Sequence, residues 1–399
     1  MQMASLLGSA VLLSVEILLT GIVGYWIVLT IAALFVARRT PDRPSDPTTR
    51  FVILVPAYNE EQSLPQTLAS IRSLDYPASL VAVHVVADNC SDRTAETARA
   101  SGATAHERFD KERRGKGYAL DWVLRRLEER TEAYDACVVV DADSVLSANF
   151  LQIMDVRLFR GERVIQGYYA VRNPERSWST ALRAVALALR HYLRPLGRMG
   201  LRGSAGMMGN GMAIAKMVAC QHSWGGALTE DVAYHAALVL AGERVTFAPD
   251  AVVYGDMPES LKTARSQNER WEAGRWEVMR RYGLPLVCEA FRRHSFVTLE
   301  TAADLLLPPL SVVAGAAVAC LLGAVIAGAP FLTGWALVIV TAIAVHVLCG
   351  LILARAPMTL YRALVFAPVL VLWKLALWVR LVFGRRPETW VRTTRTPER

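Results

Sequence analysis

The chain has 399 residues, 53% of them hydrophobic and 20% charged, and a formal net charge of +8 at pH 7. This length accommodates one large domain or two ordinary ones. No nucleic-acid-binding motif accompanies the basic charge, so we expect no nucleic-acid partner. The simpler interpretation is that the positive charge attracts the chain to anionic lipid. The six cysteines form no CxxC pair, which favours free thiols in a reducing compartment.

The first segment is almost continuously apolar. In residues 5–37 only Glu16 is charged, and a membrane span needs about 20 such residues. The run is too long for a signal peptide and has no clear cleavage site. Arg38, Arg39 and Arg43 follow it, which indicates a cytoplasmic face. We therefore expect residues 1–40 to form an N-terminal transmembrane helix that leads into a cytoplasmic domain.

Residues 41–256 have the composition of a soluble domain in which strands and helices alternate. Short apolar runs occur in "FVILVPAYNE", "LVAVHVVADN", "ACVVVDAD" and "RVIQGYY". Patterns typical of helices occupy residues 60–74, 93–102 and 117–130. This alternation predicts an α/β fold with a mostly parallel central sheet.

Polar residues follow the predicted strands at the point where each strand ends. Ligands bind beyond the carboxyl ends of the strands in such sheets, so these residues are expected to gather at one edge. They are Tyr58, Asn59 and Glu60 after the first strand, Asp88 after the second, and Asp141 and Asp143 after a later one.

Asp141 and Asp143 form a DxD pair at the end of a buried strand. Residues i and i+2 of an extended segment point to the same side, so both carboxylates can face one ligand. Their oxygens suit Mg²⁺ or Mn²⁺, which often binds together with substrate phosphates. The pattern therefore indicates a metal bound with a nucleotide diphosphate, although an acidic turn after a strand is the plainer interpretation of the pair alone.

Lys116 lies between two glycines in "GKGYAL", at the start of a predicted helix. Backbone N–H groups and a lysine at this position suit a phosphate. A solvated lysine on a capped helix is the alternative. Neither a P-loop nor a dinucleotide-binding motif is present.

Two acids occur in "GALTEDVAYH". Glu230 and Asp231 are either first-turn acids of a helix capped by Thr229, or they include a base that takes a proton from an acceptor hydroxyl.

The segment "SQNERWEAGRW" follows in residues 257–300, which are expected to form interfacial amphipathic helices. Gln267, Arg270 and Trp271 lie on or near one helical face. An interfacial helix with arginine and tryptophan at the lipid headgroup level explains much of this pattern. The alternative is that Trp271 stacks on a sugar ring.

Residues 301–384 are expected to form C-terminal transmembrane and interfacial helices. The stretches 301–329 and 332–354 are each long enough to span a membrane. The stretch 363–383 carries Lys374 and Arg380, and a basic tail at 385–399 follows it. A fourth span would place that tail outside, against the positive-inside bias, so three spans and an interfacial or re-entrant last helix are expected.

Six motifs in this order resemble a family 2 glycosyltransferase: "VPAYNEE", "VVADNCSDRT", "GKGYAL", "DAD", "TED" and "QNERW". More narrowly, they resemble the membrane-embedded inverting branch that includes cellulose, chitin and hyaluronan synthases. The resemblance covers residues 51 to about 280. It implies a GT-A nucleotide-sugar-binding domain flanked by transmembrane helices.

The resemblance also implies roles for individual residues. Asp231 matches the general base, and Asp143, with Asp141, matches the metal-binding pair. "GNGMAI", residues 209–214, matches an acceptor-side loop. The residues implied for donor binding are Tyr58, Glu60, Asp88, Lys116 and Asp141, and those implied for the acceptor and pyrophosphate are Glu230, Gln267, Arg270 and Trp271.

One position departs from the resemblance. Many relatives have two aspartates where this chain has Ala87 and Asp88, which leaves the specificity for uridine less well supported. No histidine is assigned to the metal.

The implied activity is inverting transfer of a sugar from a UDP-sugar to a lipid or glycan hydroxyl at the cytoplasmic face of the cell membrane. A processive polysaccharide synthase is the alternative within this class. A metal-dependent nucleotidyl- or phosphotransferase is a second class, but it has no special use for the Q-x-x-R-W helix. A transporter or scaffold is a third, disfavoured because the charges cluster in the soluble domain.

Overall fold

The computed structural model describes residues 2–37 and 46–383. These residues form two compact units. The sheet unit comprises residues 46–173 and Arg202–Leu305. The helical unit comprises Pro174–Leu201 with the described residues of the two terminal segments, 2–37 and 306–383. Arg38, Arg39, Arg43 and the basic tail lie outside the described residues, so the orientation inferred from them stays a prediction.

The sheet unit contains one eight-stranded sheet in the order β3-β2-β1-β4-β7-β6-β8-β5. Four of its seven strand pairs are parallel, and β7 runs antiparallel to both of its neighbours. The expected α/β fold with a mostly parallel sheet is therefore confirmed. The strands are β1 (Phe51–Ala57), β2 (Val81–Asp88), β3 (Thr104–Arg108), β4 (Ala136–Val139), β5 (Ser144–Leu146), β6 (Val164–Val171), β7 (Met212–Ala215) and β8 (Val245–Gly255).

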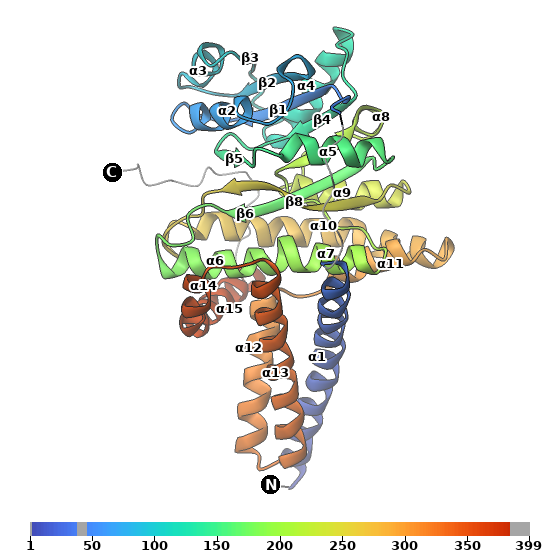
Figure 1. Cartoon of the computed structure of the whole chain (residues 1–399). Helices are drawn as coiled ribbons and strands as arrows, with labels where there is room; N and C mark the ends of the chain where they lie inside the picture. Colours follow the sequence, from blue (N-terminus) through green and yellow to red (C-terminus); the bar gives the residue numbers. More distant parts are fainter. Residues whose placement is uncertain (1, 38–45, 384–399) are drawn as a thin grey trace. The chain divides into compact units, whose positions relative to one another are not determined.

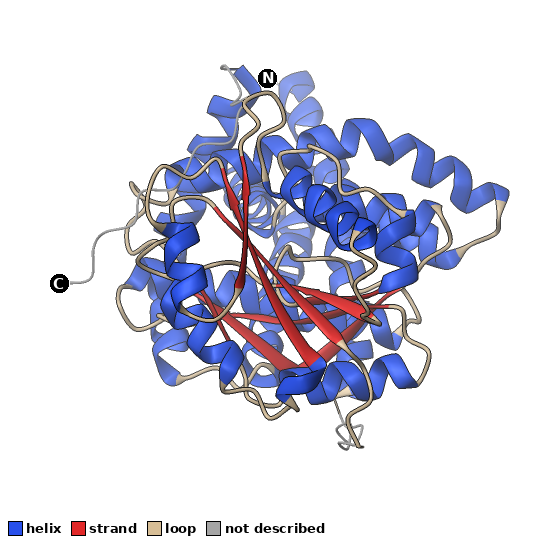
Figure 2. Ribbon diagram, turned by 90° about the horizontal axis from the view of Figure 1, so that it is seen from above, coloured by secondary structure: helices blue, strands red, loops and turns tan. Residues whose placement is uncertain are grey.

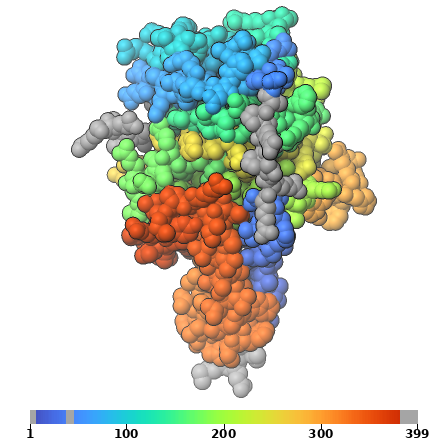
Figure 3. Space-filling view, in the orientation of Figure 1, coloured from blue at the N-terminus to red at the C-terminus, as the bar shows by residue number. Residues whose placement is uncertain are grey.

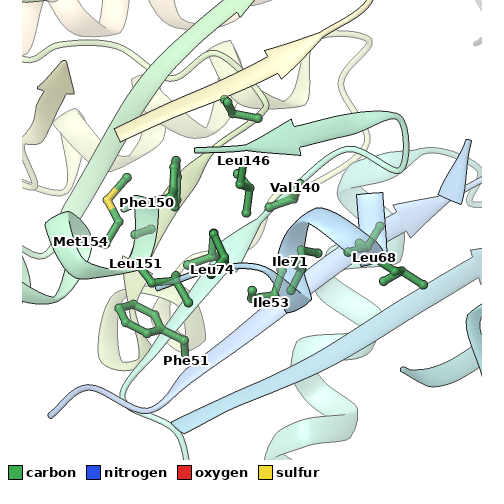
Figure 4. Packing of buried hydrophobic residues seen from close by; sticks show 14 of the residues in the cluster. Phe51, Ile53, Leu68, Ile71, Leu74, Val140, Leu146, Phe150, Leu151 and Met154 are labelled. Atoms are coloured by element: carbon green, nitrogen blue, oxygen red, sulfur yellow. The ribbon is translucent and has the colours of Figure 1, made fainter. Parts of the chain in front are cut away.

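Alternating side chains of β1 divide between two hydrophobic layers. Phe51, Ile53 and Val55 face a core that includes Leu68 and Ile71 of α2 (Leu64–Arg72) (Figure 4). The opposite face of β1 and β2 is contacted by α4 (Lys116–Glu129). Successive side chains of a strand point to opposite faces, so the near-continuous apolar run of β1 is what a strand covered on both sides requires.

The remaining helices of the sheet unit surround the twisted sheet (Figure 2). A separate apolar cluster joins α9 to α10 through Ala233, Ala236, Val278 and Leu286. This packing holds the Q-x-x-R-W helix against the helix that begins with Glu230. The helices are α3 (Thr94–Ala100), α5 (Phe150–Phe159), α8 (Lys216–Gln221), α9 (Glu230–Leu240), α10 (Arg265–Arg292) and α11 (Phe296–Leu306), with a 3₁₀ turn η1 (Ala78–Leu80).

The helical unit is built around a cluster of three long apolar helices. Leu19 and Trp26 of α1 pack with Val313 of α12 and with Ala336 and Ile339 of α13. Figure 1 shows the three helices running side by side. The elements of this unit are α1 (Gln2–Val36), α6 (Trp178–Ala188), a π-helical segment η2 (Leu189–Leu193), α7 (Arg194–Gly200), α12 (Leu310–Ile326), α13 (Pro330–Leu353), α14 (Met358–Ala363), a 3₁₀ turn η3 (Leu364–Phe366) and α15 (Ala367–Phe383).

Three described helices are long and apolar enough to cross a membrane: Leu7–Val36, Pro330–Leu353 and Met358–Arg380. The bent pair Phe296–Leu306 and Leu310–Ile326 adds a fourth if it forms one span. The stretch expected at 301–329 is thus broken near Pro308 and Pro309, residues that interrupt helical hydrogen bonding.

The last helix packs at one end of the α12–α13 hairpin. Gly315, in the second turn of α12, leaves room for Leu375 of α15, since a Cβ built there lies 2.8 Å from Leu375 Cδ1. In Figure 3 the chain from about residue 358 gathers at that end of the hairpin. Because Met358–Arg380 is itself apolar enough to span a membrane, both the interfacial or re-entrant placement of this helix and the number of membrane passes stay predictions.

Residues 174–201 belong to the helical unit although they lie inside the range expected for the catalytic domain. Gly197 and Gly200 bring α7 against the backbone of α1. A Cβ at Gly197 would overlap the Leu29 carbonyl, and one at Gly200 would lie 2.9 Å from the Ala32 carbonyl oxygen. Small residues let helix backbones approach this closely. The domains expected from the sequence are continuous stretches with boundaries near residues 40, 256, 300 and 384. The two units of the structure instead each combine segments that are distant in the sequence.

Candidate active site

The loops that follow β1 and β2 are tied together at the carboxyl edge of the sheet. The Asn59 carboxamide accepts from the Ser91 N–H at 2.7 Å, and the Glu60 N–H donates to Thr94 Oγ1 at 2.8 Å. Asn59 and Asn89 both have positive φ, 54° and 55°, a conformation that asparagine tolerates. These bonds join the Tyr58–Glu60 loop to the segment after Asp88.

Asp88 ends β2 and forms a buried ion pair. Its Oδ1 accepts from Arg108 Nη1 at 2.6 Å, and the two side chains are 10% and 6% exposed. Burial raises the pKa of the Asp88 carboxyl, and Arg108 partly opposes that shift. Arg108 also donates to the Arg113 carbonyl oxygen at 2.7 Å, so the pair holds the loop before Lys116. The sequence interpretation missed Arg108, which lies directly across from Asp88 in the β2–β3 register.

Lys116 begins α4 and joins three segments that are distant in sequence. Its Nζ donates to Asp141 Oδ1 at 2.5 Å and to the Gly209 carbonyl oxygen, and it lies 4.0 Å from Glu230 Oε1. Burial acts to lower the pKa of Lys116, but the nearby carboxylates raise it overall. Lys116 and the DxD residue Asp141 thus meet, while the phosphate-binding role of Lys116 stays a prediction.

Glu230 and Asp231 form the first turn of α9, beside Lys116. Burial and Asp231 raise the pKa of Glu230 to about 7, against the opposing charges of Lys116 and Arg270. Asp231 lies against Gly209, where a Cβ would be 3.3 Å from Asp231 Oδ2.

The expected cap on this helix is wrong. Thr229 forms no side-chain cap, and its buried hydroxyl has no hydrogen-bond partner within the described structure. Instead Thr229 packs on α10, where a Cβ at Gly274 would lie 2.6 Å from Thr229 Cγ2.

The Q-x-x-R-W residues lie in the first two turns of α10, confirming the predicted helix. Arg270 reaches the segment before α9, with Nη1 3.4 Å from the Leu228 carbonyl oxygen, and its charge acts on Glu230. Gln267 Oε1 is buried without a hydrogen-bond partner among the described residues, and Trp271 is half-buried. Arg270 therefore joins the acidic cluster, whereas within residues 46–383 neither Gln267 nor Trp271 forms a hydrogen bond or ion pair with it.

A buried asparagine holds the DxD turn. Asn210 Oδ1 accepts from the Asp141 N–H at 3.1 Å, and its Nδ2 donates to Ser144 Oγ at 2.8 Å. Ser144 Oγ in turn lies 3.3 Å from Asp143 Oδ1. Gln166 donates to the Asn210 carbonyl oxygen at 2.8 Å. Asn210 lies in the predicted acceptor-side loop. The sequence interpretation predicted neither the bond between Asn210 and Asp141 nor the bond between Gln166 and Asn210.

The DxD turn offers carboxylate oxygens, the donor type that suits Mg²⁺ or Mn²⁺. No group of three or more His, Cys, Asp or Glu side chains is arranged as a metal site within residues 2–37 and 46–383. Asp141 and Asp143 fit such a cation only if other oxygen atoms, such as those of a substrate phosphate, complete the shell.

The start of α4 interlocks with the loop that leads to α9. Asp121 accepts from Ser223 Oγ at 2.6 Å and from the Trp224 N–H at 2.8 Å. Gly117 lies against the Gly225 carbonyl, where a Cβ would overlap the oxygen. These contacts set the position of Lys116 relative to Glu230, and the sequence interpretation did not include them.

We expect Gly117→Ala to destabilise the sheet unit by about 1–3 kcal/mol, because the added methyl must displace backbone atoms. Thermal unfolding of the purified chain, followed by tryptophan fluorescence, measures the loss. Gly334→Ala is the matched control, since a Cβ there meets nothing within 4 Å. Equal unfolding temperatures for both variants would contradict the interlocked geometry.

Comparison with known proteins places these residues in one family. The model described as "Glycosyltransferase like family 2" matches residues 47–274, more than half of the chain. The probable glycosyltransferase YdaM of Bacillus subtilis is 25% identical over 246 residues, 58% of this chain and 56% of the relative. A poly-β-1,6-N-acetyl-D-glucosamine synthase of Staphylococcus epidermidis is 25% identical over 280 residues, 66% of this chain and 65% of the relative. The chain thus spans less than two thirds of either relative.

Among solved structures, a mannosyltransferase of Pyrobaculum calidifontis, in complex with GDP-Man and Mn²⁺, matches with a TM-score of 0.49 and 19% identity, covering 86% of this chain and 99% of that one. The family match includes all six motifs and the acidic cluster around Lys116. The chain belongs to glycosyltransferase family 2 and is a transferase of that family.

Proposed function

We propose that this chain moves a sugar from a UDP-sugar to a hydroxyl of a lipid or glycan at the cytoplasmic membrane face, with inversion at the anomeric carbon. The observation that carries the proposal is the meeting of Lys116, Asp141, Glu230 and Asp231 at one edge of the sheet. Phosphate-binding and proton-accepting groups are both needed for this reaction, and here they share one site. Candidate membrane helices in the same chain support an acceptor held at a membrane.

Asp231 is the proposed general base. It would take the proton of the acceptor hydroxyl as the hydroxyl oxygen bonds to the anomeric carbon and the bond from that carbon to the diphosphate breaks. Attack from the face opposite the leaving group inverts the centre. Glu230, whose pKa is raised by burial, would lie on the acceptor and pyrophosphate side.

The donor would be held by groups on both sides of the DxD turn. Tyr58, Glu60 and Asp88 are proposed to face the nucleoside, and Lys116 and Arg270 to neutralise the diphosphate. Asp143, with Asp141, would hold Mg²⁺ or Mn²⁺, which would supply positive charge to the leaving diphosphate. Gln267 and Trp271 are proposed to contact the acceptor end.

A thermal-shift measurement tests the donor site. UDP with Mn²⁺ is expected to raise the unfolding temperature by about 2–4 °C or more, because a ligand at about 100 times its Kd contributes about 2.7 kcal/mol. UDP with EDTA should give a much smaller rise, and Asp143→Asn should remove the metal-dependent part. The proposal fails if the rise with UDP is the same with Mn²⁺ and with EDTA. A panel of UDP-sugars tested for hydrolysis then identifies the donor.

Processive polymer synthesis is a second candidate. It is favoured by the similarity to proteins named poly-β-1,6-N-acetyl-D-glucosamine synthase from Staphylococcus epidermidis and Staphylococcus aureus. Sizing the products formed with native membranes separates the two: short additions support the first proposal, and a ladder of long products supports polymer synthesis. A nucleotidyl- or phosphotransferase would instead leave no new glycosidic bond.

A further inference from the structure

Arg183, on α6 of the helical unit, is a buried cation that has no counter-ion among the described residues. The residue is 7% exposed, and its Nε and Nη2 atoms have no hydrogen-bond partner within the described residues. Burial lowers the pKa of this guanidinium to about 10, with no acidic group acting on it. The guanidinium stays charged at neutral pH all the same.

Ser179 lies one helical turn before Arg183 and is also unsatisfied. It is 1% exposed, and its hydroxyl has no partner within the described structure. Residues i and i+4 of a helix are neighbours on one face, so both side chains direct donors to the same side of α6. The capping of this helix does not use Ser179, because Ser177 and Thr180 form the capping box.

A third unsatisfied side chain, and the second hydroxyl, occurs on a neighbouring helix. Thr359 Oγ1 on α14 is buried without a partner among the described residues, and α14 contacts α6. Ala181 and Leu182 of α6 pack with Ala363, which is one turn beyond Thr359 on α14. Ala181 is two residues from both Ser179 and Arg183, so this apolar contact with α14 lies on another side of α6 from their donors.

An unpaired buried guanidinium destabilises the fold, and removing it from water is favourable only when an anion and further hydrogen bonds satisfy it. Guanidinium groups bind phosphate through two parallel N–H···O bonds. Hydroxyl donors nearby suit the remaining phosphate oxygens. The donor set therefore matches a phosphate better than it matches a protein carboxylate, which the described structure does not supply.

The position of α6 indicates where such a phosphate comes from. Two of the helices that α6 contacts, α13 and α15, belong to the candidate membrane spans, and α14 begins one of them. A soluble anion has no special reason to bind among these helices, whereas a lipid headgroup is held near them by its acyl chains.

We propose that Arg183 and Ser179 bind the phosphate of an anionic membrane lipid. This site is separate from the acidic cluster around Lys116 and does not depend on which sugar is transferred. The lipid would fill the polar region beside α6 and stabilise the helical unit when bound.

The test uses the full chain in nanodiscs of phosphatidylcholine, with or without added phosphatidylglycerol. Phosphatidylglycerol is expected to raise the unfolding temperature of the unmodified protein by about 3 °C or more. Arg183→Met, which keeps the length and removes the charge, should lose most of that rise and retain one lipid fewer in native mass spectrometry. Arg190→Gln is the matched control, since Arg190 is exposed seven residues further along, and it should keep the full rise.

A second variant and an inorganic phosphate control test the site and the source of the phosphate separately. Ser179→Ala, a smaller change that preserves the fold even if Arg183→Met does not, should lose part of the rise. Inorganic phosphate added to phosphatidylcholine discs should have little effect, and a rise equal to that with phosphatidylglycerol would overturn the lipid source. The proposal is also overturned if both Arg183→Met and Ser179→Ala keep the full rise, or if Arg190→Gln loses as much as Arg183→Met.

Discussion

Replacing Asp231 with Asn is expected to reduce sugar transfer by about 10²–10⁴-fold while leaving UDP affinity within about twofold, because a positioned base contributes that factor to the rate. Asparagine keeps the size of the side chain and its place beside Gly209, but cannot accept the acceptor proton. UDP release in the presence of native membranes measures transfer, and calorimetry with UDP and Mn²⁺ measures donor binding.

Two further variants make the result specific. Asp250→Asn removes an exposed carboxylate from the same unit and should leave transfer unchanged. Glu230→Gln separates the two adjacent acids. Full activity in Asp231→Asn together with loss of activity in Glu230→Gln would assign the base to Glu230 instead.

Arg108→Met is expected to lower the free energy of unfolding by about 3–5 kcal/mol, because it leaves the Asp88 carboxylate buried without its ion pair. Denaturant unfolding of the purified chain measures the change. Adding Asp88→Asn should restore part of the loss, since a neutral amide costs less to bury. Arg50→Met is the control: the Arg50–Asp135 pair is about half exposed, with side chains 50% and 44% accessible, and its loss should change stability far less.

The loss of stability in Arg108→Met is expected to depend on pH. Burial already raises the pKa of Asp88 in the folded protein, and loss of Arg108 removes an opposing influence. A carboxyl whose pKa is higher folded than unfolded destabilises the fold above its folded pKa, and protonation removes that penalty as the pH falls. The deficit of Arg108→Met should therefore shrink in mildly acidic buffer. An unchanged deficit would show that lost packing, and not the buried charge, causes the instability.

Parts of the site were predictable because they depend on local pattern. Lys116 between two glycines predicted the start of α4, and the apolar run before Asp141 predicted β4. Lys116 begins a helix and Asp141 follows a buried strand, and both features depend on neighbouring residues in the sequence. The place of Asp141 at the sheet edge followed from the general rule for parallel strands, whereas its contact with Lys116 was not predicted.

Other parts depended on contacts between distant residues. The pairing of Arg108 with Asp88 requires the β2–β3 register. Asn210 supports the DxD turn because β7 runs antiparallel to β4, and the four residues of β7 are too few for a clear periodic signal. Thr229 had the residue type of a cap, yet packing against Gly274 of α10 determined its role.

The sequence by itself determined the alternation of strands and helices, the apolar terminal segments, and the motifs that mark a family 2 glycosyltransferase, because each rests on the chemistry of adjacent residues. Only the tertiary structure decided that residues 174–201 join the helical unit and that Asp88 is paired with Arg108. It alone also decided that Arg183 is buried with no counter-ion in the part of the chain that the structure describes. The close approach of the backbone at Gly197, the register of β2 and β3, and the burial of Arg183 all depend on segments far apart in the chain. The local sequence pattern therefore could not predict them.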